Sequence, residues 1–351
     1  MKEVAAFLAT SAGGAITRLT LSGNKISASK TWEDCDSDDE DDQPEYDSDL
    51  SGIISLCEAL PGLKNPVELD LSDCGLSVNW INLLAKAMAA GAALNSLTLD
   101  SNGIFGTLGR HGLGMASRAC HGKSDEFAGD CDAFFAALKA SNILALSLQN
   151  TGIGPLTLRN LATALPATIA RLTLSGNMIT SSSRGFLRGE YTSHDGDLSG
   201  LISLCDALPA LQNPIDLDLS DCGLSVSGVN PVVHAIQAGS VGAVSLSGCQ
   251  LEPVMVAQVL SVASEVSRLR LRAAQVLAFC CALHDRMGAD SAVCDMVDNG
   301  VVDIWQIVAS MVRAQHGNEA LRSTLACQNP WYEVCVRGLV PRRVPHWERR
   351  Q

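Results

Sequence analysis

The chain has 351 residues, of which 47% are hydrophobic, and its formal net charge is −13. This composition excludes a chain that is disordered throughout, because the apolar content is sufficient for a large core. No apolar run approaches the roughly 18 residues of a membrane span, and the short apolar run Val4–Ala9 excludes a secretory signal.

The 13 cysteines are odd in number and scattered along the chain. This pattern favours buried thiols over a disulfide framework, so a reducing, cytoplasmic location is expected. The negative charge is concentrated in one segment. Eleven acidic residues and no basic residue lie in residues 33–49, here called the acidic insert, so the rest of the chain carries only −2.

A duplicated motif organises the chain, since Leu69–Leu76 recurs almost unchanged as Leu217–Leu224. The alternation of Leu-x-Leu predicts a short strand with its leucines turned inward. The Asn or Cys that follows is expected to bond the backbone of the neighbouring turn, because an unpaired buried group costs about 1–3 kcal/mol. The pattern L-x-x-L-x-L-x-x-N/C-x-L matches eight times, at Ile16-Leu19-Leu21-Asn24-Ile26, Leu69-Leu71-Cys74-Leu76, Leu94-Leu97-Leu99-Asn102-Ile104, Leu146-Leu148-Thr151-Ile153, Ile169-Leu172-Leu174-Asn177-Ile179, Leu217-Leu219-Cys222-Leu224, Val244-Leu246-Cys249-Leu251 and Leu269-Leu271-Ala274-Val276.

Apolar residues between the strands follow helical spacing, as in Trp80–Met88 and Leu158–Leu165. Each unit is therefore a strand, a turn and a helix. These cores and helices resemble the long leucine-rich repeat of ribonuclease inhibitor and of the Ran GTPase-activating protein. The resemblance covers residues 1–276 and implies an α/β leucine-rich repeat solenoid, a curved parallel sheet with outer helices.

Long and short repeats alternate along the chain. Measured between the last strand leucines, the spacings are 50, 28, 49, 26, 45 and 27 residues, followed by a final 25. Each long repeat carries an insertion between its strand and its helix, at about 27–50, 105–129 and 180–198. Because the insertions recur at the same point of alternate repeats, we expect them on one side of the solenoid, where such insertions often bind partners.

Beyond the repeats, residues 277–329 are predicted to form a helical region that caps the solenoid or resembles an armadillo repeat. Helices are expected at 273–287, 301–315 and 319–326. Residues 330–351 form a tail rich in Pro and Arg. Cys280, Cys281, His284 and Cys294 match the spacing of no common zinc module, so no metal site is predicted there.

The acidic insert is the main candidate for partner contact. A segment with many like charges can also be a solvated loop without any function. Both interpretations, partner binding and a loop without function, stay open. Aromatic residues flank the acids and are suited to anchoring a contact. The candidate contacts in this segment are Trp32, Asp38, Asp39, Glu40, Asp41, Asp42 and Tyr46. Deleting residues 33–49 is expected to leave the fold intact.

The non-leucine strand positions form rows of mostly small polar residues on the inner face. Glu68 and Asp70, and again Asp216 and Asp218, stand out as acidic candidates for partner contact. Paired carboxylates on an open, solvated sheet lack the pocket that perturbs a catalytic group, so no enzyme activity and no cofactor are expected.

These features predict a protein–protein interaction scaffold or regulatory binding module. The partner is expected to be another protein, with a basic one as an option, rather than nucleic acid or membrane. The alternative, implied by the resemblance to the Ran activator, is activation of a small GTPase. In a third hypothesis, the Arg-rich tail at residues 330–351 docks on the acidic insert. The oligomeric state is left open.

Overall fold

The computed structural model describes residues 1–27, 47–106, 123–181, 183–184, 191–249 and 268–270, together with Val259 and Val262. The chain divides into two compact units, residues 1–250 and residues 251–351. In the second unit the strand β10, Arg268–Arg270, falls on the predicted strand around Leu269. The helices predicted at 273–326 and the tail at 330–351 lie outside the described residues.

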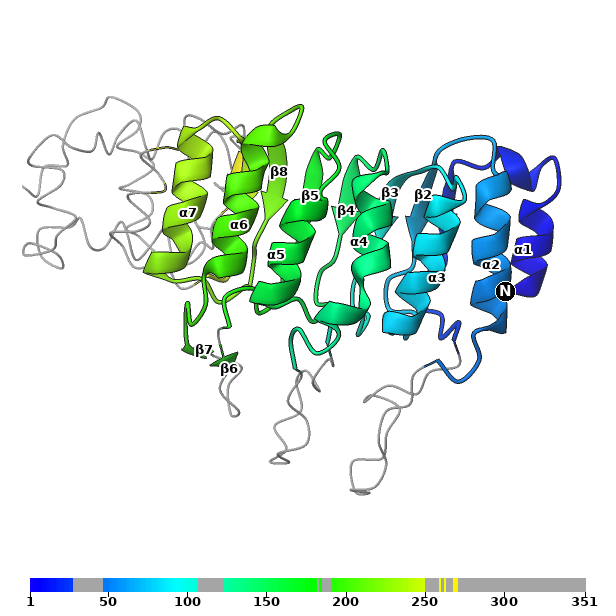
Figure 1. The fold of residues 1–351 in the computed structure, drawn as a ribbon, viewed down its shortest axis with the longest axis horizontal. Helices are drawn as coiled ribbons and strands as arrows, with labels where there is room; N and C mark the ends of the chain where they lie inside the picture. Colours follow the sequence, from blue (N-terminus) through cyan, green and yellow to red (C-terminus); the bar gives the residue numbers. More distant parts are fainter. Residues whose placement is uncertain are drawn as a thin grey trace, which may run out of the picture. The chain divides into compact units, whose positions relative to one another are not determined.

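The first unit alternates strands and helices along its length, as the sequence predicts (Figure 1). In chain order its elements are α1 Lys2–Leu8, η1 Gly13–Ala15, β1 Arg18–Thr20, α2 Ser51–Ala59, η2 Leu60–Gly62, β2 Val67–Asp70, α3 Val78–Ala89, β3 Leu94–Thr98, η4 Ala128–Asp130, α4 Asp132–Lys139, β4 Ala145–Ser147, α5 Pro155–Ala164, β5 Arg171–Thr173, β6 Ser183–Arg184, β7 Tyr191–Ser193, α6 Ser199–Ala207, η5 Leu208–Ala210, β8 Ile215–Asp218, α7 Val226–Gln237 and β9 Val241–Ser245.

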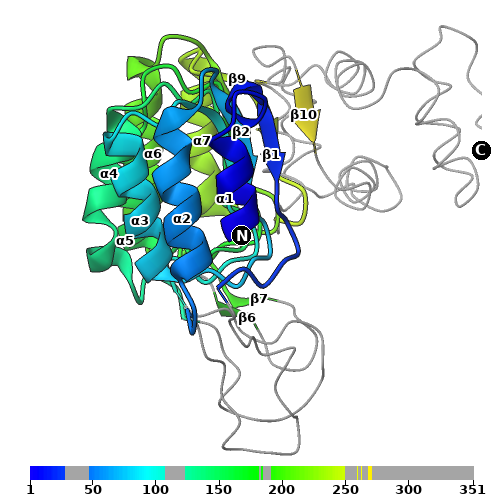
Figure 2. The ribbon, with the colours of Figure 1, turned by 90° about the vertical axis from the view of Figure 1, so that its right-hand side faces the viewer.

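Seven strands of the described part of this unit form one open parallel sheet in the order β1-β2-β3-β4-β5-β8-β9. The helices α1 to α7 stand side by side in a single layer against one face of the sheet (Figures 1 and 2). The third insertion adds an antiparallel pair, β6 with β7. This α/β repeat architecture is compatible with a repeat solenoid.

The predicted inward leucines form the core. Leu69, Leu97 and Leu172 on the strands, and Leu71 and Leu99 just after them, are no more than 1% exposed. The helices pack their apolar faces against these leucines, for example through Trp80, Ile81 and Leu84 of α3. Each fully buried Leu contributes about 1.5–3 kcal/mol, and the stacking of repeats buries residues that no single repeat covers alone.

Predicted helices agree with the observed ones to within a few residues. The pattern at 80–88 falls inside α3, and the pattern at 158–165 corresponds to α5. Helix α5 begins earlier than predicted, at Pro155, because proline lacks an N–H and fits the first helical turn. None of the described helices has the length and apolar character needed to span a bilayer.

A second duplicated segment, residues 50–61 and 198–209, carries a glycine that lets neighbouring helices approach closely. A Cβ on Gly200 of α6 would lie 2.3 Å from the carbonyl oxygen of Pro155 and 2.9 Å from its Cα, both backbone atoms of α5. The equivalent Gly52 of α2 meets Met1, where the nearest atom is a side-chain Cβ at 2.5 Å. At Gly52 the nearest backbone atom, Cα of Met1, lies 3.8 Å away, so less backbone has to shift there than at Gly200.

We therefore predict different costs for the same substitution in the two copies. Gly200→Ala should overpack the α5–α6 contact and lower the free energy of unfolding by about 1–3 kcal/mol. Gly52→Ala should cost less, and Gly62→Ala, whose added Cβ meets nothing within 4 Å, serves as a control. Urea unfolding measures all three, and equal costs for Gly52 and Gly200 would contradict the close-approach argument.

Candidate interaction surface

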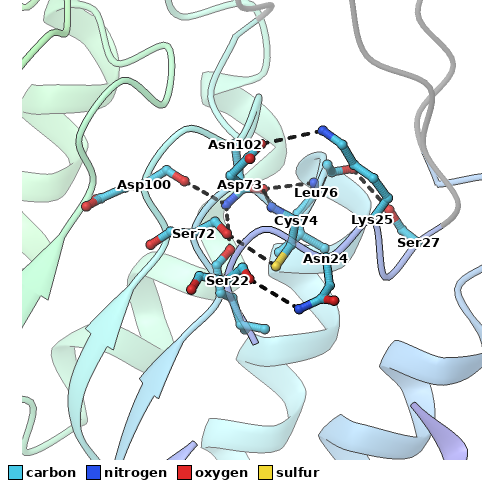
Figure 3. Close-up of polar contacts among 12 residues, drawn as sticks. Ser22, Asn24, Lys25, Ser27, Ser72, Asp73, Cys74, Leu76, Asp100 and Asn102 are labelled. Atoms are coloured by element: carbon cyan, nitrogen blue, oxygen red, sulfur yellow. Dashed lines mark hydrogen bonds and ion pairs between the residues drawn. The ribbon is translucent and has the colours of Figure 1, made fainter. Parts of the chain in front are cut away.

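The turn after each strand is held by a hydrogen-bond ladder that runs from repeat to repeat (Figure 3). The backbone N–H groups of Cys74 and Leu76 both donate to Oδ1 of Asn102 at 3.0 Å. Nδ2 of Asn102 donates to the carbonyl oxygens of Leu71 and Leu99, both at 2.9 Å. One buried amide therefore satisfies backbone groups of two successive turns.

The same arrangement recurs at Asn177. The N–H groups of Thr151 and Ile153 donate to its Oδ1 at 3.0 and 3.1 Å. Its Nδ2 donates to the carbonyl oxygens of Leu148 and Leu174 at 2.7 and 2.9 Å. The sequence-based expectation that this position bonds the neighbouring turn is confirmed at Asn102 and Asn177. It is wrong for the side chains of Asn24, which is exposed, and Thr151, because both donate to carbonyl groups of their own turn.

Cysteine and threonine replace Asn in the other turns. The thiol of Cys74 contacts the carbonyl oxygen of Leu21 at 3.2 Å, and that of Cys222 contacts Leu174 at 3.3 Å. Burial raises the pKa of the Cys74 thiol to about 11 and that of Cys249 to about 12. A protonated, buried thiol is neither a good nucleophile nor a metal ligand at neutral pH. No group of metal-binding side chains gathers among the described residues.

The turns also need left-handed backbone, which the duplicated motif supplies. Asp73 and Gly75 have φ values of 50° and 68°, and their copies Asp221 and Gly223 have 53° and 70°. Glycine adopts this region freely, and Asp tolerates it better than most residues. The Asp-Cys-Gly sequence of the motif is thus explained by the turn it forms.

We predict that the ladder amides carry much of the stability. Asn177→Leu should lower the free energy of unfolding by about 3 kcal/mol or more, because buried N–H and C=O groups on two turns lose their partners at about 1–3 kcal/mol each. Asn24→Leu is the matched control, since Asn24 is exposed and, among the described residues, its side-chain amide bonds only its own turn, at Leu21 and Ser22. Chemical unfolding that shows equal losses would contradict this role.

The face of the sheet opposite the helices carries the predicted rows of side chains in register. Arg18, Glu68 and Ser96 are successive Cα partners, followed by Ala145, Arg171 and Asp216. The second row runs through Thr20, Asp70, Thr98, Ser147, Thr173, Asp218 and Ser245. Most of these side chains are half-buried or exposed, so the rows form a continuous, accessible, mostly polar surface.

Glu68 is already paired within the chain. Nε of Arg18 donates to Oε2 of Glu68 at 2.7 Å, and NH2 lies 2.5 Å from the same oxygen. Sequence reasoning did not pair these residues, although both stand in its first row. The charge of Glu68 is therefore partly neutralised, which makes it a weaker partner contact than the sequence suggests.

Asp70 and Asp218 occupy equivalent positions and make equivalent contacts. Oδ1 of Asp70 accepts hydrogen bonds from N–H and Oγ of Ser72 at 3.0 and 2.7 Å. Oδ1 of Asp218 accepts from N–H and Oγ of Ser220 at 2.9 and 2.5 Å. One carboxylate oxygen thus stabilises the turn, and the other, Oδ2, has no hydrogen bond to any described residue. Asp216 lies opposite Arg171 in the register.

Asp100 lies beside this acidic group and differs from it. Burial raises the pKa of its carboxyl above the ordinary value, although hydrogen bonds from Oγ of Ser147 and N–H of Gln149 partly offset the effect. The nearby charge of Asp70 acts in the same direction as burial. Asp100 is engaged with the next repeat rather than presented to a partner.

The three predicted insertions are closed at equivalent points. N–H of Asp49 donates to the carbonyl oxygen of Ser27, N–H of Phe127 to that of Phe105, and N–H of Asp197 to that of Thr180, at 3.0, 3.1 and 3.0 Å. These bonds join the two ends of each insertion. The described bases of the insertions therefore share one structural position in alternate repeats.

An aspartate at the end of the second and third insertions caps the helix of the next repeat. Oδ1 of Asp125 accepts N–H groups of Gly154 and Thr157 at 2.9 Å, and Oδ2 accepts that of Leu156 at 2.8 Å. Asp195 accepts N–H groups of Ser225 and Gly228 at 3.3 and 2.8 Å.

Asp47 is the equivalent residue of the first insertion and accepts hydrogen bonds from two side chains, Oγ of Ser77, which is the N-cap of α3, and Nδ2 of Asn79. The sequence did not reveal these contacts. For Asp47 and Asp195 a signal was present in the repeated sequence Asp-x-Asp-Leu-Ser-Gly, at residues 47–52 and 195–200, but Asp125 lies outside this repeat.

We predict that Asp125→Ala lowers the free energy of unfolding by about 2 kcal/mol, because three N–H groups at the start of α5 lose their acceptor. Asp125→Asn should lose less, since it keeps an acceptor oxygen and forfeits only the charge near the helix N-terminus, about 0.3–1 kcal/mol. Asp206→Ala, at an exposed position of α6, is the control. If thermal unfolding shows that Asp125→Asn is less stable than Asp125→Ala, the capping role is contradicted.

The residues predicted to contact a partner from the acidic insert lie outside the described residues. They are Trp32, Asp38, Asp39, Glu40, Asp41, Asp42 and Tyr46. Their role stays a prediction. The structure places the other predicted contacts on one face of one sheet as two separate pairs, with β3, β4 and β5 between them; the pairs are Glu68 with Asp70 and Asp216 with Asp218.

No protein-family model matches this chain, and no curated protein matches it.

Proposed function

We propose that this chain is a leucine-rich repeat protein of the ribonuclease-inhibitor-like type and acts as a scaffold that binds another protein. The repeat type is supported by the Asn and Cys ladder at Asn102, Cys74 and Asn177, which links successive turns at the position that the repeat pattern reserves for these residues. The alternation of parallel strands with a single helix layer agrees with it.

The observation that carries the binding role is the registered polar surface of the sheet. Its rows run through seven strands without a break in the pairing. Side chains held at a fixed spacing on a rigid sheet need little ordering on binding, which lowers the entropic cost of an interface. An extended surface of this kind suits a macromolecular partner better than a small molecule, which needs a concave pocket.

The partner contacts we propose are the acidic insert and the acids of the sheet face. Asp70 and Asp218 are the stronger candidates on the face, because each keeps one carboxylate oxygen that no described residue engages. A basic protein is the complementary partner. Charge pairing of this kind steers association and weakens as salt screens it over about 10 Å at 0.1 M.

The structure changes the design of the test. Asp47 and Asp49 hold α3 and the base of the insertion, so deleting residues 33–49 would damage the fold that the experiment needs intact. Neutralising the five acids at 38–42 to Asn and Gln leaves these anchors in place. The matched control neutralises five exposed acids of the body, Glu3, Glu58, Asp130, Asp132 and Asp206, with the same change in net charge.

Affinity capture from cell extract with quantitative mass spectrometry compares the two variants with the parent protein. We expect the insert variant to lose its basic partners, with binding weakened about 10-fold, because five exposed ion pairs at about 0.2–1 kcal/mol each are removed. The control should keep them, and captured partners should elute as salt rises. Identical partners in both variants would contradict a binding role for the insert.

One assay distinguishes the proposed scaffold from an activator of a small GTPase. Purified protein is added to a panel of small GTPases and GTP hydrolysis is followed. Binding without stimulation supports the scaffold, whereas stimulated hydrolysis would replace it with the activator.

A further inference from the structure

The strand β1 ends the sheet in the described part of the chain, and one of its edges has no neighbouring strand. The opposite edge is bonded to β2, where N–H of Leu21 donates to Asp70 and N–H of Glu68 donates to Thr17. Alternate residues of a strand direct their backbone groups to opposite sides, so the N–H and C=O groups of Arg18 and Thr20 point to the open edge. Figure 2 views this end of the sheet, with β1 and α1 foremost.

The core positions of this first repeat are only half covered. Leu19 and Leu21 are half-buried, whereas the equivalent Leu69 and Leu71 of the second repeat are 1% and 0% exposed. Ile26 is also half-buried, and its equivalent Leu76 is 0% exposed. A further strand beside β1 would complete this burial.

Asn24 shows which groups that strand should bring. Like Asn102, it donates through Nδ2 to its own turn, at Leu21 and Ser22. At Asn102 the Oδ1 also accepts two N–H groups of the preceding turn, those of Cys74 and Leu76, and Nδ2 reaches the carbonyl oxygen of Leu71. No described residue makes these three further bonds with Asn24, so its amide is an acceptor and donor already placed for a preceding turn.

The charges at this edge favour an acidic neighbour. Residues 16–27 carry Arg18 and Lys25 and no acid. Within the chain, both meet acids of the next repeat, Arg18 with Glu68 and Lys25 with Asp73. The side chain of Arg18 remains 72% exposed, so it is accessible to a second carboxylate from the other side.

We infer that the edge of β1 is a docking site for an acidic strand-and-turn segment of another polypeptide, which pairs parallel to β1 and places its turn on Asn24. Such a segment resembles residues 66–77 of this chain, which carry the N–H pair that Asn102 accepts and the acids Glu68, Asp70 and Asp73. Main-chain bonds supply affinity and the leucines supply register, as in other cases of strand addition.

A second copy of this chain fits the edge less well. Pairing β1 with its own copy around a two-fold axis makes the strands antiparallel, and it brings Arg18 and Lys25 of both copies together. It also supplies no preceding turn for the Asn24 amide. The proposal is independent of the acidic insert, because it uses a different surface.

The test uses the full chain and a fluorescent synthetic peptide with the sequence of residues 66–77, followed by anisotropy. Thr20→Pro removes an outward N–H without touching the β2 ladder, and edge strands tolerate proline there. Thr20→Ala is the matched control, because it removes the same side chain and keeps the N–H. We expect saturable binding that is about 10-fold weaker for Thr20→Pro than for Thr20→Ala.

Asn24→Ala gives a second readout, with a comparable loss and an unchanged unfolding transition. A peptide with Glu68→Lys should also bind more weakly, since it faces Arg18. Absence of saturable binding, equal binding by Thr20→Pro and Thr20→Ala, or equal binding of a scrambled peptide would each overturn the proposal. A dimer in sedimentation that Thr20→Pro abolishes, without peptide binding, would assign the edge to a second copy instead.

Discussion

Strands β2 to β9 of the parallel sheet end in turns that are largely buried, and the backbone groups of these turns must find partners away from water. In most of these turns one Asn or Cys side chain bonds across to the neighbouring repeat. At Asn102 and Asn177 a single amide serves two successive turns, and Cys74 and Cys222 contribute a thiol contact to the carbonyl oxygen of the turn before. Because an unpaired buried group costs about 1–3 kcal/mol, this ladder fixes the register on which the leucine core and the rows of the open face depend.

The insertions are also anchored to the body by hydrogen bonds. Each leaves the body after a strand and is closed by a backbone hydrogen bond. The second and third also place an aspartate at the N-terminus of the helix in the following repeat, Asp125 for α5 and Asp195 for α7. The body therefore does not depend on what lies between the anchors. This separation lets a segment as highly charged as residues 33–45 be inserted without introducing charge into the leucine core.

The two surfaces proposed for binding use different physics. The face of the sheet and the acidic insert offer charge, which gives specificity and rapid association and is sensitive to salt. The edge of β1 offers backbone hydrogen bonds, half-covered leucines and the Asn24 amide, which give affinity through burial and register. A partner that engaged both would bind through two kinds of interaction at once.

The sequence by itself determined the repeat, its strands and helices, the buried Asn and Cys positions and the rows of the open face, because strand and helix periodicities and turn chemistry are local properties. It did not reveal the pairing of Arg18 with Glu68 or the contacts that Asp47, Asp125 and Asp195 make at the N-termini of helices. Those contacts join residues about 30 to 50 positions apart. Which of these distant groups meet is decided only by the stacking of one repeat on the next. The same stacking leaves groups at the open edge of β1 without a neighbouring repeat in the described part of the chain.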